Sequence, residues 1–363
     1  MAAVSGTPLE DPSCTTSESE PRTTAARVHH LTKQETVANA TPECNMMQLM
    51  NRRDFTRLSS LAALGLTVPA AWAEAFDYPW KLGIITDEVD LDLARVLSEF
   101  YPKYSLRWAE IRNLKLGGQN RYVYNSATPD QLKQIKKQLD DAGVRLSILD
   151  TGVYKIALPG TRPLGENSRD LNPAQGQYAH QLEDLKRGAD AAHALGTERL
   201  RIFTFKRVSD PSAIFERIVE DLNKALEVAK QQSVTLLVEN EFDCNIATGG
   251  ESAKLFNAIK DSRLMHNWDP GNCYEAGEQP FPKAWDQLDH SRIAHIHLKD
   301  AKAKRWEPIG GGEIDFSGQF KALKAMKYSG TMSLETHYKN PEKNPYTSSV
   351  ESMDGLFRVL KQV

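Results

Sequence analysis

Short apolar runs and longer mixed runs alternate along the chain from residue 78 to the C-terminus. The short runs favour β-strands, in which successive side chains point to opposite faces with a period of two. We predict eight strands: KLGIITDEV (81–89), SLRWAEIR (105–112), VRLSILDTGV (144–153), TERLRIFTF (197–205), VTLLVENE (234–241), LMHNWDPGN (264–272), IAHIHLKD (293–300) and GTMSLETHY (330–338).

A helix is predicted after each strand. The second helix shows the expected boundaries, with Thr128 at the N-cap, Pro129 in the first turn and Gly143 beyond the end. The predicted helices cover residues 92–104, 128–143, 177–195, 210–231, 251–260, 281–289, 315–326 and 348–363.

Eight strand–helix units in succession predict a single α/β domain. Their combined length of roughly 290 residues is usual for a (β/α)8 TIM barrel, which we expect over residues 78–363. A doubly wound sheet would need a glycine-rich turn after an early strand to bind a dinucleotide. Gly310-Gly311-Gly312 comes too late in the chain for that role.

Composition narrows the class of partners. The 363 residues are 40% hydrophobic and 26% charged, as in globular proteins, and a formal net charge of −3 gives no reason to expect nucleic acid. No apolar run reaches the roughly 20 residues that cross a membrane, so we expect no stable membrane anchor in the mature protein. The sequence leaves open whether the chain forms a homo-oligomer.

Two segments of different character precede the predicted barrel. Residues 1–49 are rich in Ser, Thr, Pro and Glu, and we interpret them as disordered or as an extension ahead of the true start. Residues 50–73 combine Arg52-Arg53, a short apolar stretch and the small-residue pattern Ala71-Trp72-Ala73. These parts in this order are typical of an export signal, and the Arg pair followed by Asp and Phe resembles a twin-arginine signal. The alternative is an amphipathic N-terminal helix.

Polar side chains occupy the C-terminal ends of the last four predicted strands, where a buried strand would normally carry Val, Ile or Leu. In a TIM barrel these ends form the active-site face, so we expect the side chains to meet there. The polar residues are Glu239 and Glu241 on the fifth strand, Asp269 and Asn272 on the sixth, His295, His297 and Lys299 on the seventh, and Glu335 and His337 on the eighth.

A divalent cation would explain why three carboxylates and an imidazole are predicted to gather in one place. Without a cation, Glu239, Asp269 and Glu335 would repel one another, and at least one would take up a proton. Together with His297 they form an oxygen-rich set that suits Mn²⁺, Co²⁺ or Mg²⁺, with Zn²⁺ as a further option. For each residue alone, the alternative is an ordinary ion pair.

The motifs LLVENE, HNWDPGN, HIHLKD and SLETH resemble those of the xylose-isomerase-like TIM barrels, and the resemblance extends over residues 81–363. That family includes sugar isomerases, ketose 3-epimerases, inosose dehydratases and type-IV endonucleases. The resemblance implies that Glu239, Asp269, His297 and Glu335 are the metal ligands, with His297 preferred over His295. It also implies that Glu239 and Glu335 move protons beside the carbonyl of an open-chain sugar or keto-sugar.

Two positions depart from the pattern of the ketose epimerases. Asn272 and Glu241 stand where those enzymes carry histidines, which argues against a free ketohexose as the substrate. Lys299 has an alternative role as the partner of Asp300 or Glu335 in an ion pair. The residues that we expect to contact a small sugar substrate are Glu110, Lys206, Glu241, Asn272, His295, Lys299 and His337.

The expected activity is that of a metal-dependent isomerase or epimerase, and the alternative is a lyase or dehydratase acting on an oxidised sugar or inosose. A phosphodiesterase like the type-IV endonucleases would need further histidines, yet none lies between His30 and His180. A non-catalytic sugar-binding barrel would tolerate the loss of a carboxylate, so the complete ligand set argues against it. We expect Cys244 and Cys273 to be free thiols, with a disulfide as the alternative.

Export can be tested directly. We expect the mature N-terminus near Glu74, and replacing both Arg52 and Arg53 by Lys should retain the precursor in the cytoplasm, because a twin-arginine signal is an address read by a receptor. N-terminal sequencing of protein from the periplasmic fraction checks both points. Recovery of chains that still begin at Met1 from that fraction would contradict the assignment.

Overall fold

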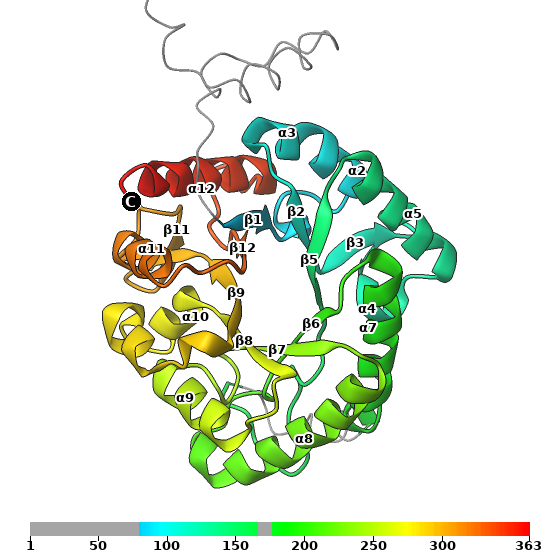
Figure 1. Cartoon of the computed structure of the whole chain (residues 1–363), viewed down its shortest axis with the longest axis vertical. Helices are drawn as coiled ribbons and strands as arrows, with labels where there is room; N and C mark the ends of the chain where they lie inside the picture. The colour runs from blue at the N-terminus through cyan, green and yellow to red at the C-terminus, as the bar shows by residue number, and fades with distance from the viewer. Residues whose placement is uncertain (1–79, 166–175) are drawn as a thin grey trace, which may run out of the picture. The chain divides into compact units, whose positions relative to one another are not determined.

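Eight parallel strands form a ring in the computed structural model, which describes residues 80–165 and 176–363 (Figure 1). The ring confirms the predicted TIM barrel. Residues 1–49 and the predicted export signal, 50–73, lie outside the described residues. The barrel strands are β1 (Lys81–Ile84), β2 (Trp108–Ile111), β5 (Arg145–Asp150), β6 (Arg199–Ile202), β7 (Thr235–Glu239), β8 (Leu264–Trp268), β9 (Ile293–Leu298) and β12 (Thr331–Leu334).

The strands pair side by side in the order β1-β12-β9-β8-β7-β6-β5-β2. A parallel bridge between Ile85 and Glu110 joins the two ends of this sheet. Because the strands are parallel, all of their C-terminal ends lie at the same end of the barrel. The strands carrying the four predicted metal ligands, β7, β8, β9 and β12, are consecutive neighbours in this order.

Helices surround the ring of strands and cover its outer face (Figure 1). The longer ones show clear N-terminal signals, such as the capping box at the start of α5. There the Thr128 side chain accepts the backbone N–H of Gln131, and the Gln131 side chain accepts the backbone N–H of Thr128. The described helices are α2 (Leu93–Arg95), α3 (Tyr101–Tyr104), α4 (Val123–Ser126), α5 (Pro129–Asp141), α7 (Gln181–Leu195), α8 (Phe215–Gln231), α9 (Gly249–Ala258), α10 (Pro270–Glu275), α11 (Phe316–Ala325) and α12 (Pro345–Leu360).

Several predicted elements have different bounds in the structure. The first strand, predicted over 81–89, ends at Ile84, and the helix predicted over 92–104 is divided by a π turn (Val96–Phe100). The sixth strand, predicted over 264–272, ends at Trp268, because the Asp269 carboxylate accepts the backbone N–H of Asn272 and starts α10. The helix predicted over 281–289 is present only as short irregular turns and not as a regular α-helix. A π turn (Pro280–Ala284) and a 3-10 turn (Trp285–Gln287) lie there, and Phe281 within the first has the extended angles φ −133° and ψ 134°.

Two β-hairpins were not predicted. The first joins β3 (Asn113–Leu116) to β4 (Gln119–Tyr122) through two glycines with positive φ angles. The second joins β10 (Asp300–Lys302) to β11 (Arg305–Glu307) through Ala303 and Lys304, whose φ angles are 49° and 57°. Neither alanine nor lysine is typical of a tight hairpin turn, so the second hairpin has no local sequence signal.

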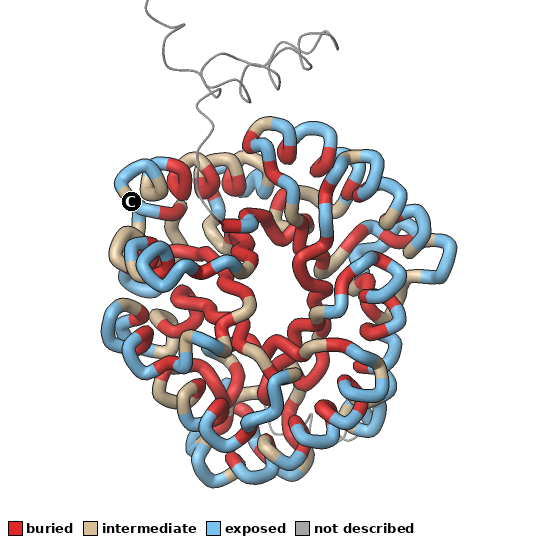
Figure 2. The backbone as a smooth tube through the Cα atoms, in the orientation of Figure 1, coloured by how far each residue is buried: buried red, intermediate tan, exposed pale blue. Residues whose placement is uncertain are grey.

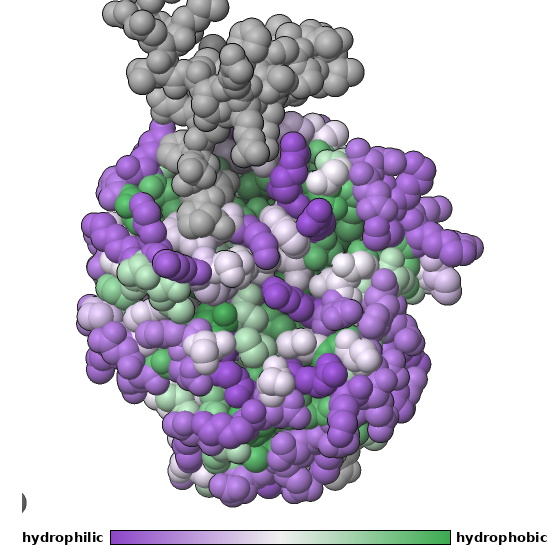
Figure 3. All heavy atoms as spheres, in the orientation of Figure 1, coloured by the Kyte–Doolittle hydropathy of each residue, from purple (hydrophilic) through white to green (hydrophobic). Residues whose placement is uncertain are grey.

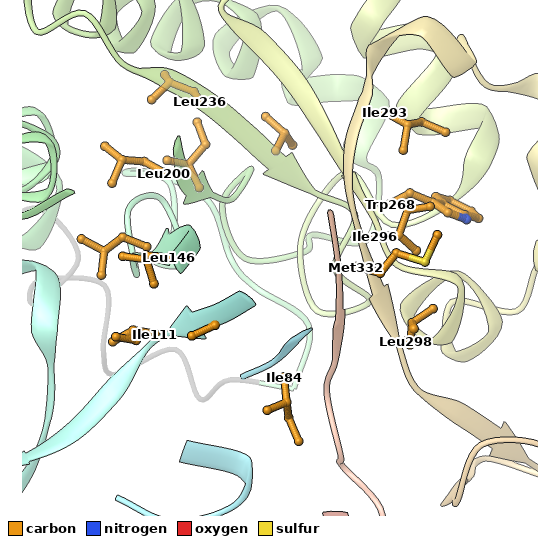
Figure 4. Close-up of a cluster of buried hydrophobic side chains, with 14 of the residues drawn as sticks. Ile84, Ile111, Leu146, Leu200, Leu236, Trp268, Ile293, Ile296, Leu298 and Met332 are labelled. Carbon is orange, nitrogen blue, oxygen red and sulfur yellow. The ribbon is translucent and has the colours of Figure 1, made fainter. Parts of the chain in front are cut away.

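Apolar and polar side chains separate on the two faces of the barrel wall. Leu82, Leu298 and Met332 point outwards and line one apolar space together with Phe320 of α11 and Leu356 of α12. Each such side chain contributes about 1.5–3 kcal/mol when fully buried. Figure 2 shows the buried residues following the wall and the inner sides of the helices, and Figure 4 shows the cluster beside β9.

The other face of β9 points into the barrel and carries histidines. Register pairs His295 with Thr331 and His297 with Ser333, and all four side chains are buried. A TIM-barrel interior is more often filled by layers of Val, Ile and Leu. This interior is therefore polar close to its C-terminal end, where the predicted site lies.

Cys244 and Cys273 are both buried and are free thiols, which confirms that prediction. The described helices include none with the length and apolar character that a membrane crossing needs. On the face seen in Figure 3, hydrophilic side chains cover most of the rim, and apolar side chains show between them.

Candidate metal centre

The four predicted ligands meet at the C-terminal ends of neighbouring strands. Glu239 is the last residue of β7, Asp269 follows β8, His297 lies in β9 and Glu335 follows β12. One ligand atom from each residue lies within 4.8 Å of all the others. His297 Nδ1 is central, at 3.2 Å from Glu239 Oε1, 3.4 Å from Glu335 Oε2 and 3.6 Å from Asp269 Oδ2.

A second carboxylate system lies on the other side of the His297 ring. Glu110 of β2 is fully buried, and its two oxygens lie 2.8 Å from Nε2 of His297 and 2.8 Å from Nε2 of His295. His295 Nδ1 in turn lies 2.6 Å from the Thr331 hydroxyl. A carboxylate on the far nitrogen of a ligating histidine fixes the ring orientation and raises its basicity. Glu110 therefore aims His297 Nδ1 at the three carboxylates.

Lys299 neutralises two of the carboxylates. Its ammonium is buried and lies 2.9 Å from Asp269 Oδ2 and 2.7 Å from Glu335 Oε2. The ion pair with Glu335 is the alternative considered from the sequence. These two oxygens are also the ones that face His297 Nδ1. Lys299 and a metal ion would therefore share the same donors.

Two arginines pair with the oxygens of Glu239 and Glu335 that face away from His297. Arg201 lies 3.2 Å from Glu239 Oε2 and 3.0 Å from the buried carboxylate of Asp150. Arg112 lies 3.0 Å from Glu335 Oε1. The inner oxygens of Glu239 and Glu335 thus remain turned towards His297. Neither arginine was singled out from the sequence, although Arg112 ends the predicted second strand and Arg201 lies within the predicted fourth strand.

The surrounding cations keep Glu239 and Glu335 ionised. Burial raises the pKa of Glu239, but His297 and Arg201 outweigh it and lower that pKa to about 2. Burial also opposes ionisation of Glu335, and Lys299 and His337 hold its pKa well below the ordinary value. For His297 burial lowers the pKa, yet the carboxylates of Glu110 and Glu239 raise it well above the ordinary value. Because a metal ligand must lose its proton, metal binding should release a proton from His297.

Two asparagines hold the strand ends together. Asn272 Nδ2 donates to Glu239 Oε1 at 3.0 Å and to Asp269 Oδ2 at 3.1 Å. Asn240 is fully buried and grips the backbone of Asp269, accepting its N–H at 2.7 Å and donating to its carbonyl at 2.8 Å. Asn240 was missed from the sequence, although its place between Glu239 and Glu241 was a usable signal.

The other residues predicted to contact substrate lie at different depths. His337 is 30% exposed and lies 3.2 Å from Glu335 Oε1, whereas Glu241 is buried and pairs with Lys155 at 2.6 Å. Lys206 pairs with Asp243, away from the four ligands. Glu110 and His295 are engaged with other protein groups as described above. Contact with substrate stays a prediction for all of these residues, as it does for Asn272 and Lys299.

The donor set fits a divalent cation. Two other groups among the described residues come close enough to share an ion, namely Glu110 with both barrel histidines, and Glu88 with Glu335 and His337. The group of Glu239, Asp269, His297 and Glu335 is the largest, is buried throughout and has three hard oxygen donors. Oxygen-rich sets of this kind suit Mn²⁺, Co²⁺ or Mg²⁺, and the imidazole also allows Zn²⁺.

The chain belongs to the xylose isomerase-like TIM barrel family, whose sequence profile matches residues 114–356, more than half of the chain. An inosose dehydratase of Clostridium perfringens is 23% identical over 157 residues, which cover 38% of this chain and 52% of that protein. An uncharacterized protein of Methanocaldococcus jannaschii is 30% identical over 135 residues, covering 37% of this chain and 48% of the relative. The chain thus matches about half the length of these curated relatives.

Solved structures show the same fold at low identity. An IOLI protein with a bound zinc atom is 15% identical, with a TM-score of 0.59 over 78% of this chain and 98% of that chain. An L-ribulose 3-epimerase is 16% identical, with a TM-score of 0.56 over 77% and 94%. A D-psicose 3-epimerase with D-fructose is 15% identical, with a TM-score of 0.56 over 78% and 100%.

The role of Asn240 can be tested by stability and metal affinity together. In Asn240→Ala the buried N–H of Asp269 loses its partner, and the Asp269 carbonyl keeps only the N–H of Cys273, so we expect the free energy of unfolding to fall by about 1–3 kcal/mol. Affinity for Mn²⁺ should fall as well, because Asp269 is no longer held. Urea unfolding in chelator and calorimetric titration measure the two effects.

The matched control is Asn257→Ala on the exposed side of α9, which should change stability by less than about 0.5 kcal/mol. Equal behaviour of the two variants would contradict the role given to Asn240.

Proposed function

We propose that this chain is a divalent-metal-dependent enzyme that moves a proton at the carbon beside the carbonyl of a sugar or keto-sugar, as an isomerase or epimerase. The convergence of Glu239, Asp269, His297 and Glu335 on one buried position carries this proposal. Family membership supports it, since the similar proteins include sugar epimerases and inosose dehydratases.

Those four residues would hold the ion. When bound, it polarises the substrate carbonyl and makes the neighbouring C–H more acidic. Glu239 and Glu335 come from β7 and β12, with β8 and β9 between them, so they reach the site from its two ends. One carboxylate, in its ionised form, can remove the proton, and the other must first take up a proton in order to deliver one to the opposite face, which is the pairing that general acid–base catalysis requires.

The charged neighbours of Glu335 determine its position, its strength as a base and its route for proton exchange with solvent. Lys299 and Arg112 contact different oxygens of its carboxylate and hold it in place. They also make it a weak base, so catalysis requires that the Lys299 contact loosen when substrate binds. His337 touches Glu335 and is partly exposed, which gives a proton taken by Glu335 a route to solvent.

A second function shares the same first step. In a dehydratase, proton removal beside the carbonyl is followed by loss of a hydroxide from the next carbon. The partial similarity to inosose dehydratases favours this candidate, as does the replacement of the epimerase histidines by Asn272 and Glu241. Product analysis separates the two, because only the dehydratase yields an unsaturated or deoxygenated product.

The metal site can be tested through Lys299. We expect chelator-treated wild-type protein to bind one Mn²⁺ per chain by calorimetry, and Asp269→Asn to weaken this binding. Lys299→Met should bind Mn²⁺ at least tenfold more tightly, because the ammonium no longer competes for Asp269 and Glu335. Without metal, Lys299→Met should lose stability, since it leaves buried carboxylates unpaired.

Lys206→Met serves as the control, because it removes a lysine whose partner, Asp243, is not one of the four ligands. It should leave Mn²⁺ affinity unchanged. If Lys299→Met weakens Mn²⁺ binding instead, the shared-donor arrangement is wrong.

The proton-transfer step can be tested by exchange of carbon-bound hydrogen in D₂O. Glu335→Gln and Glu239→Gln each keep an oxygen ligand and the side-chain shape but remove the basic group. We expect either variant to bind metal with a modest loss and to exchange substrate hydrogen at least about 10²-fold more slowly. The substrates are a panel of aldoses, ketoses and cyclic keto-sugars, assayed with Mn²⁺.

Glu227→Gln, on the exposed side of α8, is the matched control and should exchange at the wild-type rate. Exchange that continues unchanged in both site variants would exclude Glu239 and Glu335 as the bases. Loss of exchange in both, with metal still bound, supports them.

A further inference from the structure

The β10–β11 hairpin follows β9, which carries His297, with Lys299 as the single residue between the two. It is antiparallel and pairs Ala301 with Trp306, outside the eight-stranded barrel sheet. A hairpin of two short strands is marginally stable by itself, so its position depends on contacts with the rest of the protein.

Asp300 fixes the base of the hairpin and the loop that follows. Its buried carboxylate accepts the backbone N–H groups of Gly310 at 2.9 Å, Gly312 at 3.0 Å and Ile314 at 3.3 Å. An added Cβ at Gly312 would collide with this carboxylate, so glycine is required there. The triple glycine noted in the sequence therefore folds around Asp300 and steadies the hairpin.

Tyr274 fixes the turn of the hairpin. Its hydroxyl accepts the N–H of Ala303 at 3.1 Å and donates to Glu313 at 2.6 Å. Tyr274 lies in α10, the helix that Asp269 caps. The hairpin is thus tied to the same helix as one of the four predicted ligands.

This arrangement presents Trp306 beside the metal centre. The Lys299 ammonium lies 5.3 Å from the centre of its ring, within cation–π distance. The ring of His337 meets it edge-on at 5.1 Å between centroids, and Phe242 lies at 6.4 Å. Trp306 is half-buried, and Phe242 is 39% exposed. The three rings come from the loops after β9, β12 and β7, on different sides of the site.

We propose that Trp306, Phe242 and His337 form an aromatic surface that binds the apolar C–H face of a cyclic polyhydroxylated ketone, either a carbocycle or a keto-sugar in its ring form. Ligand sites commonly combine aromatic walls with a few polar groups that fix orientation. Here the aromatic surface adjoins the polar cluster of carboxylates and Lys299. An open-chain sugar has no flat C–H face to place on the indole, so the surface selects a closed ring.

This inference rests on the proposed function, because it assigns the substrate class to the same site. The test compares two ligands by calorimetric binding to the Mn²⁺-loaded protein. One is 2-keto-myo-inositol, a carbocyclic ketone that cannot open, and the other is erythrulose, an acyclic ketose too short to form a six-membered ring. We expect Trp306→Ala to weaken binding of the cyclic ketone at least tenfold and to change erythrulose binding less than threefold.

Matched variants separate the aromatic effect from loss of structure. Trp306→Phe keeps an aromatic face and should retain most of the affinity for the cyclic ketone. Leu164→Ala removes an exposed apolar side chain from another loop and should have no effect. Mn²⁺ affinity should be unchanged in all three variants.

Equal losses for both ligands in Trp306→Ala, or no loss for either, would overturn the inference, as would failure of the wild-type protein to bind the cyclic ketone. Binding and turnover fail separately. Trp306-dependent binding of the cyclic ketone without hydrogen exchange would contradict the proposed function and leave the aromatic surface standing. Hydrogen exchange in the wild type, with binding of the cyclic ketone unchanged in Trp306→Ala, would support the proposed function and contradict the aromatic surface.

Discussion

One imidazole ring lies between two sets of buried carboxylates, and the rest of the centre is arranged around this contact. His297 faces Glu110 through one nitrogen and faces Glu239, Asp269 and Glu335 through the other. Burying a carboxylate without a partner costs several kcal/mol, so four of them in one place require compensation. Lys299, Arg112 and Arg201 provide it, and each pairs with a carboxylate oxygen without moving the ligand atoms away from His297.

Much of the fold follows from local sequence signals. Alternating strand and helix patterns predicted all eight barrel strands, and the period of two put His295 and His297 on one face of β9. The positions of strand ends were harder to predict, because a cap such as Asp269 can end a strand that still has a strand-like pattern. The β10–β11 hairpin was missed since its stability comes from Asp300 and Tyr274, which act from outside the turn.

The candidate site also contains some residues that the sequence predicts and others that it does not. Acidic and imidazole groups at strand ends are visible in the sequence, because they interrupt apolar runs. Arg112, Arg201 and Asn240 were not foreseen, since their importance depends on which strands become neighbours. Glu110 was expected to contact substrate, and only the three-dimensional structure shows that it sits behind His297. Pairings between residues far apart in the chain are fixed by the closed barrel and have no local signature.

The polar interior also bears on how the barrel assembles. On β9 the histidines at 295 and 297 face inwards, and Ile296 and Leu298 face the helices. A slip of this strand by one residue would exchange the two sets. Aliphatic side chains would then lie among ionised carboxylates, and imidazoles would lie against the apolar helix layer. Both changes are costly, whereas a barrel filled with aliphatic residues on both faces would tolerate the slip far better. The residues that form the candidate metal centre therefore also select the correct alignment of the strands during folding.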